Sequence, residues 1–130
     1  VRKKNTTACF EKALEHSNKA IKANSVKADA YLAKGYFLSG LYLTNKGGSR
    51  ELEWGGREKA VEVADRGYSL ITNDAYQFGL AGEVYGLSSE FQKSTNAFKK
   101  LFEIDDNPTD TFTSFYMQMS YLNNDYGYRN

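Results

Sequence analysis

The sequence predicts an all-α protein, and three observations support this fold class. Pro108 is the only proline in 130 residues, so long helices can form without interruption. Alanine, lysine, glutamate and leucine fall in stretches with helical spacing of the apolar residues. Glycines with an aromatic residue four positions upstream also recur at intervals of a few tens of residues. With 41% apolar residues, the chain is expected to form one domain with its own core.

The first three helices are expected over residues 10–24, 28–43 and 57–71. In the first of them, Phe10 and Leu14 fall on one stripe, whereas lysines and glutamates lie outside it. The same spacing of apolar and small residues continues in the second and third stretches. Each stretch therefore predicts an amphipathic helix with one buried face.

Three further helices are expected over residues 75–87, 91–104 and 110–122. Polar residues at 72–74 and 88–90 separate the neighbouring stretches. The fifth helix is expected to end before Pro108, because proline cannot continue a helix, and Thr109 or Asp110 can cap the sixth. Six helices arranged in pairs follow from this pattern.

The chain contains an internal repeat. The sequence numbers of Gly82 and Tyr116 differ by 34, and each residue follows an aromatic residue by four positions, Phe78 or Phe112. Gly35 precedes Gly82 by 47 residues and also follows an aromatic residue, Tyr31, by four positions. Because the second interval is longer than the first, one repeat is expected to contain an insertion, which we place at 44–56.

These residues resemble the tetratricopeptide repeat, a helix-turn-helix unit of about 34 residues. We take Ala75 as the first residue of one unit. Phe78 then occupies the aromatic position, Ala81-Gly82 the Leu-Gly position and Tyr85 the tyrosine position, and Phe91 begins the second helix. Two departures stand out, because Ser94 replaces a small alanine and Pro108 lies two residues after the family's proline. The resemblance covers residues 10–126 and implies an α-α superhelix of helix-turn-helix repeats.

The resemblance divides the single domain, residues 1–130, into four units. Residues 10–27 form a half repeat, residues 28–74 a repeat with an insertion at 44–56, residues 75–108 a second complete repeat, and residues 109–126 a final half repeat. Because the chain begins with Val1 and not with Met, we expect it to be a piece of a longer protein.

The resemblance implies a concave groove that is lined by the first helix of each unit. The corresponding residues are Asp29, Leu32, Tyr36 and Ser39, then Tyr76, Gly79, Glu83 and Gly86, and finally Asp110, Thr113, Met117 and Ser120. Tyrosines can grip a peptide, and Gly79 and Gly86 are expected to leave room for its side chains. The acidic tails of heat-shock chaperones are a disfavoured ligand, since they require lysine and asparagine there. The alternative is that these side chains form ordinary solvated helix surface.

The insertion contains four glycines and the only tryptophan, Trp54. Beside Leu52, this side chain can serve as a partner-binding element. The alternative is that the insertion lengthens the neighbouring helices by one or two turns and that Trp54 packs between them.

The end of the chain is rich in large apolar side chains, more than one helix face can bury. They are Phe112, Phe115, Tyr116, Met117, Met119, Tyr121, Tyr126 and Tyr128. The alternatives are a missing segment that covers this edge, packing on another subunit, and a final helix that exposes its tyrosines.

Several function classes are disfavoured. A net charge of +1 argues against nucleic acid, and no apolar run approaches the length of a membrane span. His16 is the only histidine and falls on a charged helix side, so neither a catalytic triad nor a metal site is expected. Cys9, the only cysteine, excludes an intrachain disulfide. This favours the cytoplasm, although exported domains without disulfides are also common.

We therefore expect a non-enzymatic protein-protein interaction scaffold that needs no cofactor. Its partner-binding residues are expected to include Asp29, Leu32, Tyr36, Tyr76, Gly79, Glu83 and Trp54. One alternative is a structural subunit that forms a homo-oligomer or a larger assembly through its aromatic C-terminal edge. A helical repeat protein that binds a small ligand is a further alternative.

Overall fold

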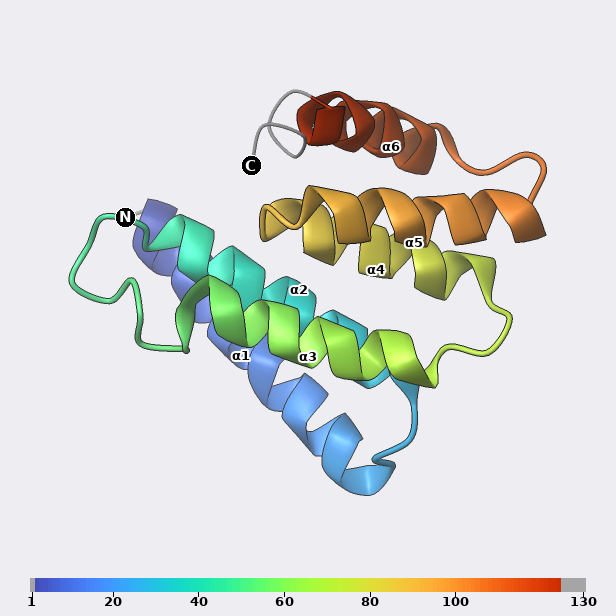
Figure 1. Cartoon of the computed structure of the whole chain (residues 1–130). Coiled ribbons are helices and arrows are strands. Elements are labelled where there is room, and N and C mark those ends of the chain that lie inside the picture. The colour runs from blue at the N-terminus through green and yellow to red at the C-terminus, as the bar shows by residue number, and fades with distance from the viewer. Residues whose placement is uncertain (1, 125–130) are drawn as a thin grey trace.

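The computed structural model describes residues 2–124, which form six helices and contain no strand. Figure 1 shows their arrangement. The helices are α1 (Arg2–Ala23), α2 (Ala28–Thr44), α3 (Gly56–Leu70), α4 (Ala75–Leu87), α5 (Phe91–Ile104) and α6 (Asp110–Leu122). The prediction of an all-α fold with six helices is therefore confirmed for this part of the chain. The main difference is that α1 begins at Arg2, eight residues earlier than expected.

Side chains cap the starts of two helices, and the cap at Thr109 was predicted from the sequence. The Asp74 carboxylate accepts a hydrogen bond from the Gln77 amide at 3.1 Å, and the Thr109 hydroxyl accepts one from the Phe112 amide at 3.4 Å. Each cap satisfies a backbone donor that has no partner within the helix. Helix α5 ends at Ile104, so the segment up to Pro108 forms the expected break.

The helices stack in sequence order. We call α2, α4 and α6 the first helices and α1, α3 and α5 the second helices. Each first helix contacts the second helix before it, α2 and α4 also contact the second helix that follows, and neighbouring first helices contact one another. In Figure 1, α1 lies at the lower edge of the stack and α6 at its upper edge. The first and last helices of the described chain thus lie at opposite edges of the stack.

Small residues allow the helices to cross closely. A methyl group added at Gly82 would lie 2.6 Å from the ring of Phe98, a fully buried residue of α5. At Gly35 the same addition would lie 3.4 Å from the Ala60 carbonyl oxygen and 3.6 Å from the Ala64 methyl group. The core therefore depends on backbone contacts at the positions where the repeat pattern predicts small residues.

The departure at Ser94 has a structural reason. Its hydroxyl is fully buried and donates a hydrogen bond to the Gly82 carbonyl at 2.7 Å, which ties α5 to α4. A second buried contact joins the hydroxyls of Ser39 and Ser88 at 3.0 Å and ties α2 to α4. These polar groups are buried with partners, as a low-dielectric core requires.

The structural repeat between α4 and α6 is 35 residues, one more than the interval that the sequence pattern suggested. The caps Asp74 and Thr109 are 35 residues apart. The residues of α4 that pack toward α2 are Gln77, Leu80 and Val84, and those of α6 that pack toward α4 are Phe112, Phe115 and Met119, again 35 residues on. Met117, and not Tyr116, is thus the structural equivalent of Gly82.

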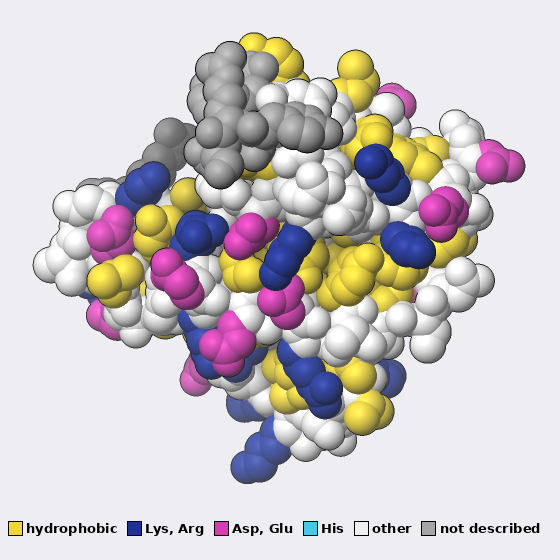
Figure 2. All heavy atoms as spheres, in the orientation of Figure 1, with side chains coloured by type: hydrophobic (Ala, Val, Ile, Leu, Met, Phe, Trp, Pro, Cys, Tyr) yellow, Lys and Arg dark blue, Asp and Glu magenta, His cyan; other side chains and the backbone are white. Residues whose placement is uncertain are grey.

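The surface carries mixed charge. On the face shown in Figure 2, basic and acidic side chains are interspersed, with hydrophobic side chains visible between them. None of the helices in residues 2–124 combines the length and hydrophobicity that a membrane crossing needs.

Candidate interaction surfaces

Four of the predicted partner-binding residues form a stripe across two adjacent helices. We call Asp29 and Tyr36 of α2, with Tyr76 and Glu83 of α4, the α2–α4 stripe. Each pair is seven residues apart, so both members lie on one face of their helix. Two contacts hold α2 and α4 together: the side-chain amide of Gln77 donates a hydrogen bond to the Asp29 carboxylate, and Val84 packs against Gly35.

The stripe offers two aromatic rings of different exposure. Tyr76 is 66% exposed, and its ring centre lies 6.0 Å from that of Phe112 in α6. Tyr36 is half-buried and meets Phe37 edge to face, also at 6.0 Å. Such rings combine a large apolar contact area with a hydroxyl that can form hydrogen bonds.

Glu83 gives the stripe its electrostatic character. It is half-buried, and burial raises the pKa of its carboxyl group above the ordinary value. Burial is the cause of this shift, because removal from water disfavours the charged form. A cation placed beside Glu83 would therefore be stabilised by a carboxylate that has lost part of its hydration.

Leu32 and Gly79 do not line an open groove. Leu32 is fully buried against Gly67 of α3, and Gly79 lies beneath Phe112 of α6 and Leu101 of α5. The space expected above Gly79 and Gly86 is also filled, in the second case by Phe115 and Met119. The prediction that these positions face a partner is wrong, because they lie at helix crossings.

The remaining residues of the expected groove vary in exposure. Ser39 is buried through its contact with Ser88. Asp110 and Met117 are exposed, whereas Thr113 and Ser120 are half-buried. The α2–α4 stripe and the four α6 positions are therefore the parts of the predicted surface whose residues are all at least partly accessible.

A hollow of about 480 Å³ lies between α1 and α2, and sequence reasoning missed it. We call it the α1–α2 groove. It is lined by Ala13, His16, Ser17 and Ala20 of α1, by Lys27, and by Asp29, Ala30, Ala33 and Phe37 of α2. Five of these nine residues are alanine or serine. The signal was present in the repeat, since the equivalents of three α1 residues, Ala60, Ala64 and Gly67, hold α2 against α3.

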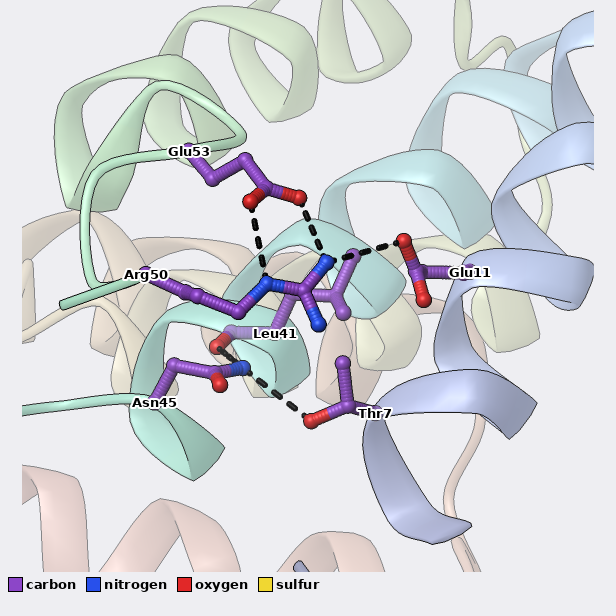
Figure 3. Close-up of polar contacts among 6 residues, drawn as sticks. All are labelled: Thr7, Glu11, Leu41, Asn45, Arg50 and Glu53. Atoms are coloured by element: carbon purple, nitrogen blue, oxygen red, sulfur yellow. Dashed lines mark hydrogen bonds and ion pairs between the residues drawn. The ribbon is translucent and has the colours of Figure 1, made fainter. Parts of the chain in front are cut away.

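The insertion folds back onto the helices. Figure 3 shows Arg50 between two carboxylates: its Nη2 lies 2.6 Å from Glu53 and 3.3 Å from Glu11 of α1. Beside it, the buried Asn45 amide donates to the Leu41 carbonyl at 2.8 Å and to the Thr7 hydroxyl at 3.2 Å. The loop is therefore joined to both α1 and α2.

Trp54 packs within this arrangement. The Arg50 guanidinium lies 4.8 Å from the centre of its ring, and the half-buried indole packs against Leu38, Ala60 and Val63. The expectation that the insertion lengthens the helices is wrong, because α2 ends at Thr44 and α3 begins at Gly56. Trp54 also lines a second hollow with residues of α1, so a binding role stays a prediction.

The aromatic residues of α6 divide between core and surface. Phe112 and Met119 are buried, and Tyr116 packs on Phe102 with ring centres 4.9 Å apart. Met117 and Tyr121 are each 66% exposed. Tyr126 and Tyr128 lie outside the described residues.

The main polar cluster outside these surfaces joins three helices. The Tyr85 hydroxyl donates to Asp65 at 2.6 Å, and the Lys93 ammonium lies 3.1 Å from both oxygens of the same carboxylate. Burial, followed by the hydrogen bond to Asp65, raises the pKa of Tyr85. This phenol therefore keeps its proton and acts as a structural donor between α3 and α4. Residues 2–124 contain no cluster of three or more histidine, cysteine, aspartate or glutamate side chains that could hold a metal ion.

Comparison of the chain with protein-family models, with curated proteins and with solved structures found no match.

Proposed function

We propose that this chain is a helical repeat module of tetratricopeptide type that binds a protein or peptide segment without catalysing a reaction. Support for the repeat type comes from the paired helices and from the small residues at their crossings, Gly35, Ala60, Ala64 and Gly82. Support for binding comes from the α2–α4 stripe, where aromatic and acidic side chains stand together on two adjoining helices.

The half-buried Glu83 is the observation that carries the proposal. A carboxylate with a raised pKa and aromatic neighbours on the same surface favours a basic ligand. A lysine or arginine side chain would pair with Glu83 and could also lie over a tyrosine ring, and Asp29 adds a second acidic group. The partner segment therefore combines basic side chains with apolar residues that contact Tyr36 and Tyr76.

A random peptide library displayed on phage tests this proposal. The module should enrich peptides that carry lysine or arginine next to apolar residues. The Tyr36→Ala/Tyr76→Ala variant should bind the enriched peptides at least about tenfold more weakly, which corresponds to about 1.4 kcal/mol. Leu52→Ala is the matched control, since Leu52 is as exposed as Tyr76, at 66%, but lies in the insertion.

A second variant separates charge from apolar contact. Glu83→Gln should remove the preference for basic residues while keeping part of the affinity for apolar ones. The proposal fails if no peptide is enriched, or if the double tyrosine variant and Leu52→Ala bind the enriched peptides equally well.

A further inference from the structure

The α1 wall of the α1–α2 groove repeats a surface that elsewhere holds a helix. Three residues of the α1 wall have equivalents in α3 that lie 47 residues later: Ala13, Ser17 and Ala20 correspond to Ala60, Ala64 and Gly67. The starts of α2 and α4 are separated by the same 47 residues. The three α3 residues contact α2: Ala60 and Ala64 lie beside Gly35, and Gly67 lies beside Leu32. In α1, the three equivalent residues line a hollow.

The α2 wall repeats a second such surface. Ala30, Ala33 and Phe37 precede Gln77, Leu80 and Val84 by the same 47 residues. In α4, Gln77 bonds to Asp29 and Val84 packs against Gly35, both in the preceding first helix, α2, and Leu80 packs on the core cluster that includes Leu32. Both walls of the groove therefore occupy the repeat positions that receive a first helix elsewhere in the stack.

The opposite edge of the stack carries the complementary surface. Ser114, Met117 and Tyr121 of α6 follow Gly79, Gly82 and Gly86 of α4 by 35 residues. The three α4 glycines are buried beneath side chains of α5 and α6. Their equivalents in α6 are all exposed, Met117 and Tyr121 at 66% each. Helix α6 thus presents to solvent the face that α4 buries.

The two edges also differ in charge. Residues 16–27 contain three lysines and no acidic residue, whereas residues 103–110 contain four acidic residues and no basic one. Asp29 lies in the groove but already accepts a hydrogen bond from Gln77. Helix α2 runs antiparallel to α3, because Leu32 near its start contacts Gly67 near the end of α3. If α6 of a second copy packed on α1 as α2 packs on α3, the acidic start of that α6 would lie near the basic end of α1.

We propose that copies of this chain join head to tail, with α6 of one copy seated in the α1–α2 groove of the next. The exposed face of α6 then packs on the small residues of α1 and α2 as α2 packs on α3 and α4 within one chain. The contact joins two different surfaces, so it continues from copy to copy and produces open chains or a ring. Of the α2–α4 stripe, Asp29 lines the groove, whereas Tyr36, Tyr76 and Glu83 do not.

Two variants with complementary defects test the proposal in sedimentation velocity experiments. Ala13→Glu/Ala20→Glu blocks the groove, and Ser114→Glu/Met117→Glu blocks the α6 face. The wild-type chain should form species larger than a dimer as concentration rises. Each variant alone should stay at the monomer mass of 14.7 kDa, and an equimolar mixture should form a dimer of twice that mass and nothing larger.

Matched controls keep the result interpretable. Ala8→Glu adds one glutamate at an exposed position on another side of α1 and should assemble like the wild type. Circular dichroism and thermal unfolding verify that all variants are folded, and the four substituted positions are all exposed or half-buried.

Three results would overturn the proposal. They are a wild-type chain that stays monomeric up to about 1 mM, blocked variants that self-associate like the wild type, and a mixture that forms no dimer. A persistent monomer would leave the groove to a different helix, from another part of the same protein or from a different protein. None of these results bears on peptide binding, since Tyr36, Tyr76 and Glu83 are unchanged.

Discussion

At the scale of single residues, the fold depends on glycines and alanines whose neighbours occupy the space that a larger side chain would need. The clearest case is Gly82, which lies against the ring of Phe98 and whose carbonyl accepts a hydrogen bond from Ser94. Gly35 is less tightly enclosed, because the nearest neighbour of an added methyl group there is Val84 at 3.1 Å. Gly35 should therefore tolerate substitution by alanine better than Gly82 does.

Gly82→Ala is expected to lower the free energy of unfolding by about 1–2 kcal/mol. Displacing a buried ring costs about 1–3 kcal/mol, and the higher helix propensity of alanine offsets up to about 1 kcal/mol of this. Gly35→Ala should change stability by less than about 1 kcal/mol, since the Val84 methyl group needs to move only slightly. Urea unfolding followed by circular dichroism measures both. A larger loss at Gly35 than at Gly82 would contradict this reading of the crossings.

Glu83 makes stability depend on pH. The folded-state pKa of Glu83 lies above the ordinary value of 4.5. The contribution of Glu83 to the free energy of unfolding is therefore fully present below pH 4.5 and is lost as the pH rises through the folded-state pKa. Glu83→Gln stays neutral and lacks this loss. The unfolding free energy of the variant minus that of the wild type should therefore increase from about pH 4 to about pH 8. A difference that stays constant over this range would show that Glu83 is well hydrated.

Residue positions on the helices could be predicted from the sequence more readily than their exposure. Tyr36 was correctly predicted to lie in the helix that is α2, and Tyr76 and Glu83 in the helix that is α4. Leu32 and Gly79 were assigned to the same surface, yet both are buried at helix crossings. Periodicity indicates which residues share a face. How far that face is covered depends on the distance and rotation of the next helix, which the pattern of one helix does not contain.

At the scale of elements, the insertion acts as a joint between α1 and the first helix pair. Asn45 ends α2 and, through Thr7, reaches α1 from 38 residues away in the sequence. Arg50 makes a second connection to α1 through Glu11, although these side chains are more exposed. The helical start of α1 was not predicted, because residues 2–9 lack an apolar stripe. This part of the helix contacts the insertion through the Thr7–Asn45 hydrogen bond, and such a contact between distant residues is not visible in local periodicity.

Asn45→Ala should lower the free energy of unfolding by about 1–2 kcal/mol. The substitution removes two hydrogen bonds and leaves the buried Thr7 hydroxyl without this donor. Lys46→Ala is the control, because Lys46 is the exposed neighbour in the same loop. Chemical denaturation of both variants supplies the comparison, and equal stability of the two would show that the Asn45 contacts contribute little.

The spacing of elements was predicted to within one residue. The period of about 34 residues relates the second helices, since Ala60 and Ala64 correspond to Ser94 and Phe98. The caps Asp74 and Thr109 show that α6 starts one residue later than this period allows. A shift of one residue along an α-helix moves a side chain by about 100° around the helix axis. The face of α6 that is exposed could therefore be identified only from its contacts.

At the scale of the whole molecule, the stack has a groove at one edge and an exposed helix face at the other, and the segments beside them carry opposite charge. The groove has small side chains and a basic flank, whereas the α6 face has Met117 and Tyr121 and an acidic start. Head-to-tail assembly should therefore weaken as salt screens the attraction. Between about 0.05 M and about 0.5 M NaCl, the mean mass at fixed protein concentration should decrease. Light scattering measures this mass, and an increase with salt would indicate that apolar contact alone drives association.

A disulfide between copies tests the proposed repeat register most directly. Ala20 and Ser114 are the equivalents of the contacting pair Gly67 and Leu32, so cysteines at these positions should lie within the short reach of a disulfide. One copy carries Cys9→Ser/Ala20→Cys and the other Cys9→Ser/Ser114→Cys, because the native Cys9 is exposed. On oxidation, the mixed dimer should form faster than either like dimer, and faster than when Ala8→Cys replaces Ala20→Cys. Equal rates for the two pairings would contradict the proposed register.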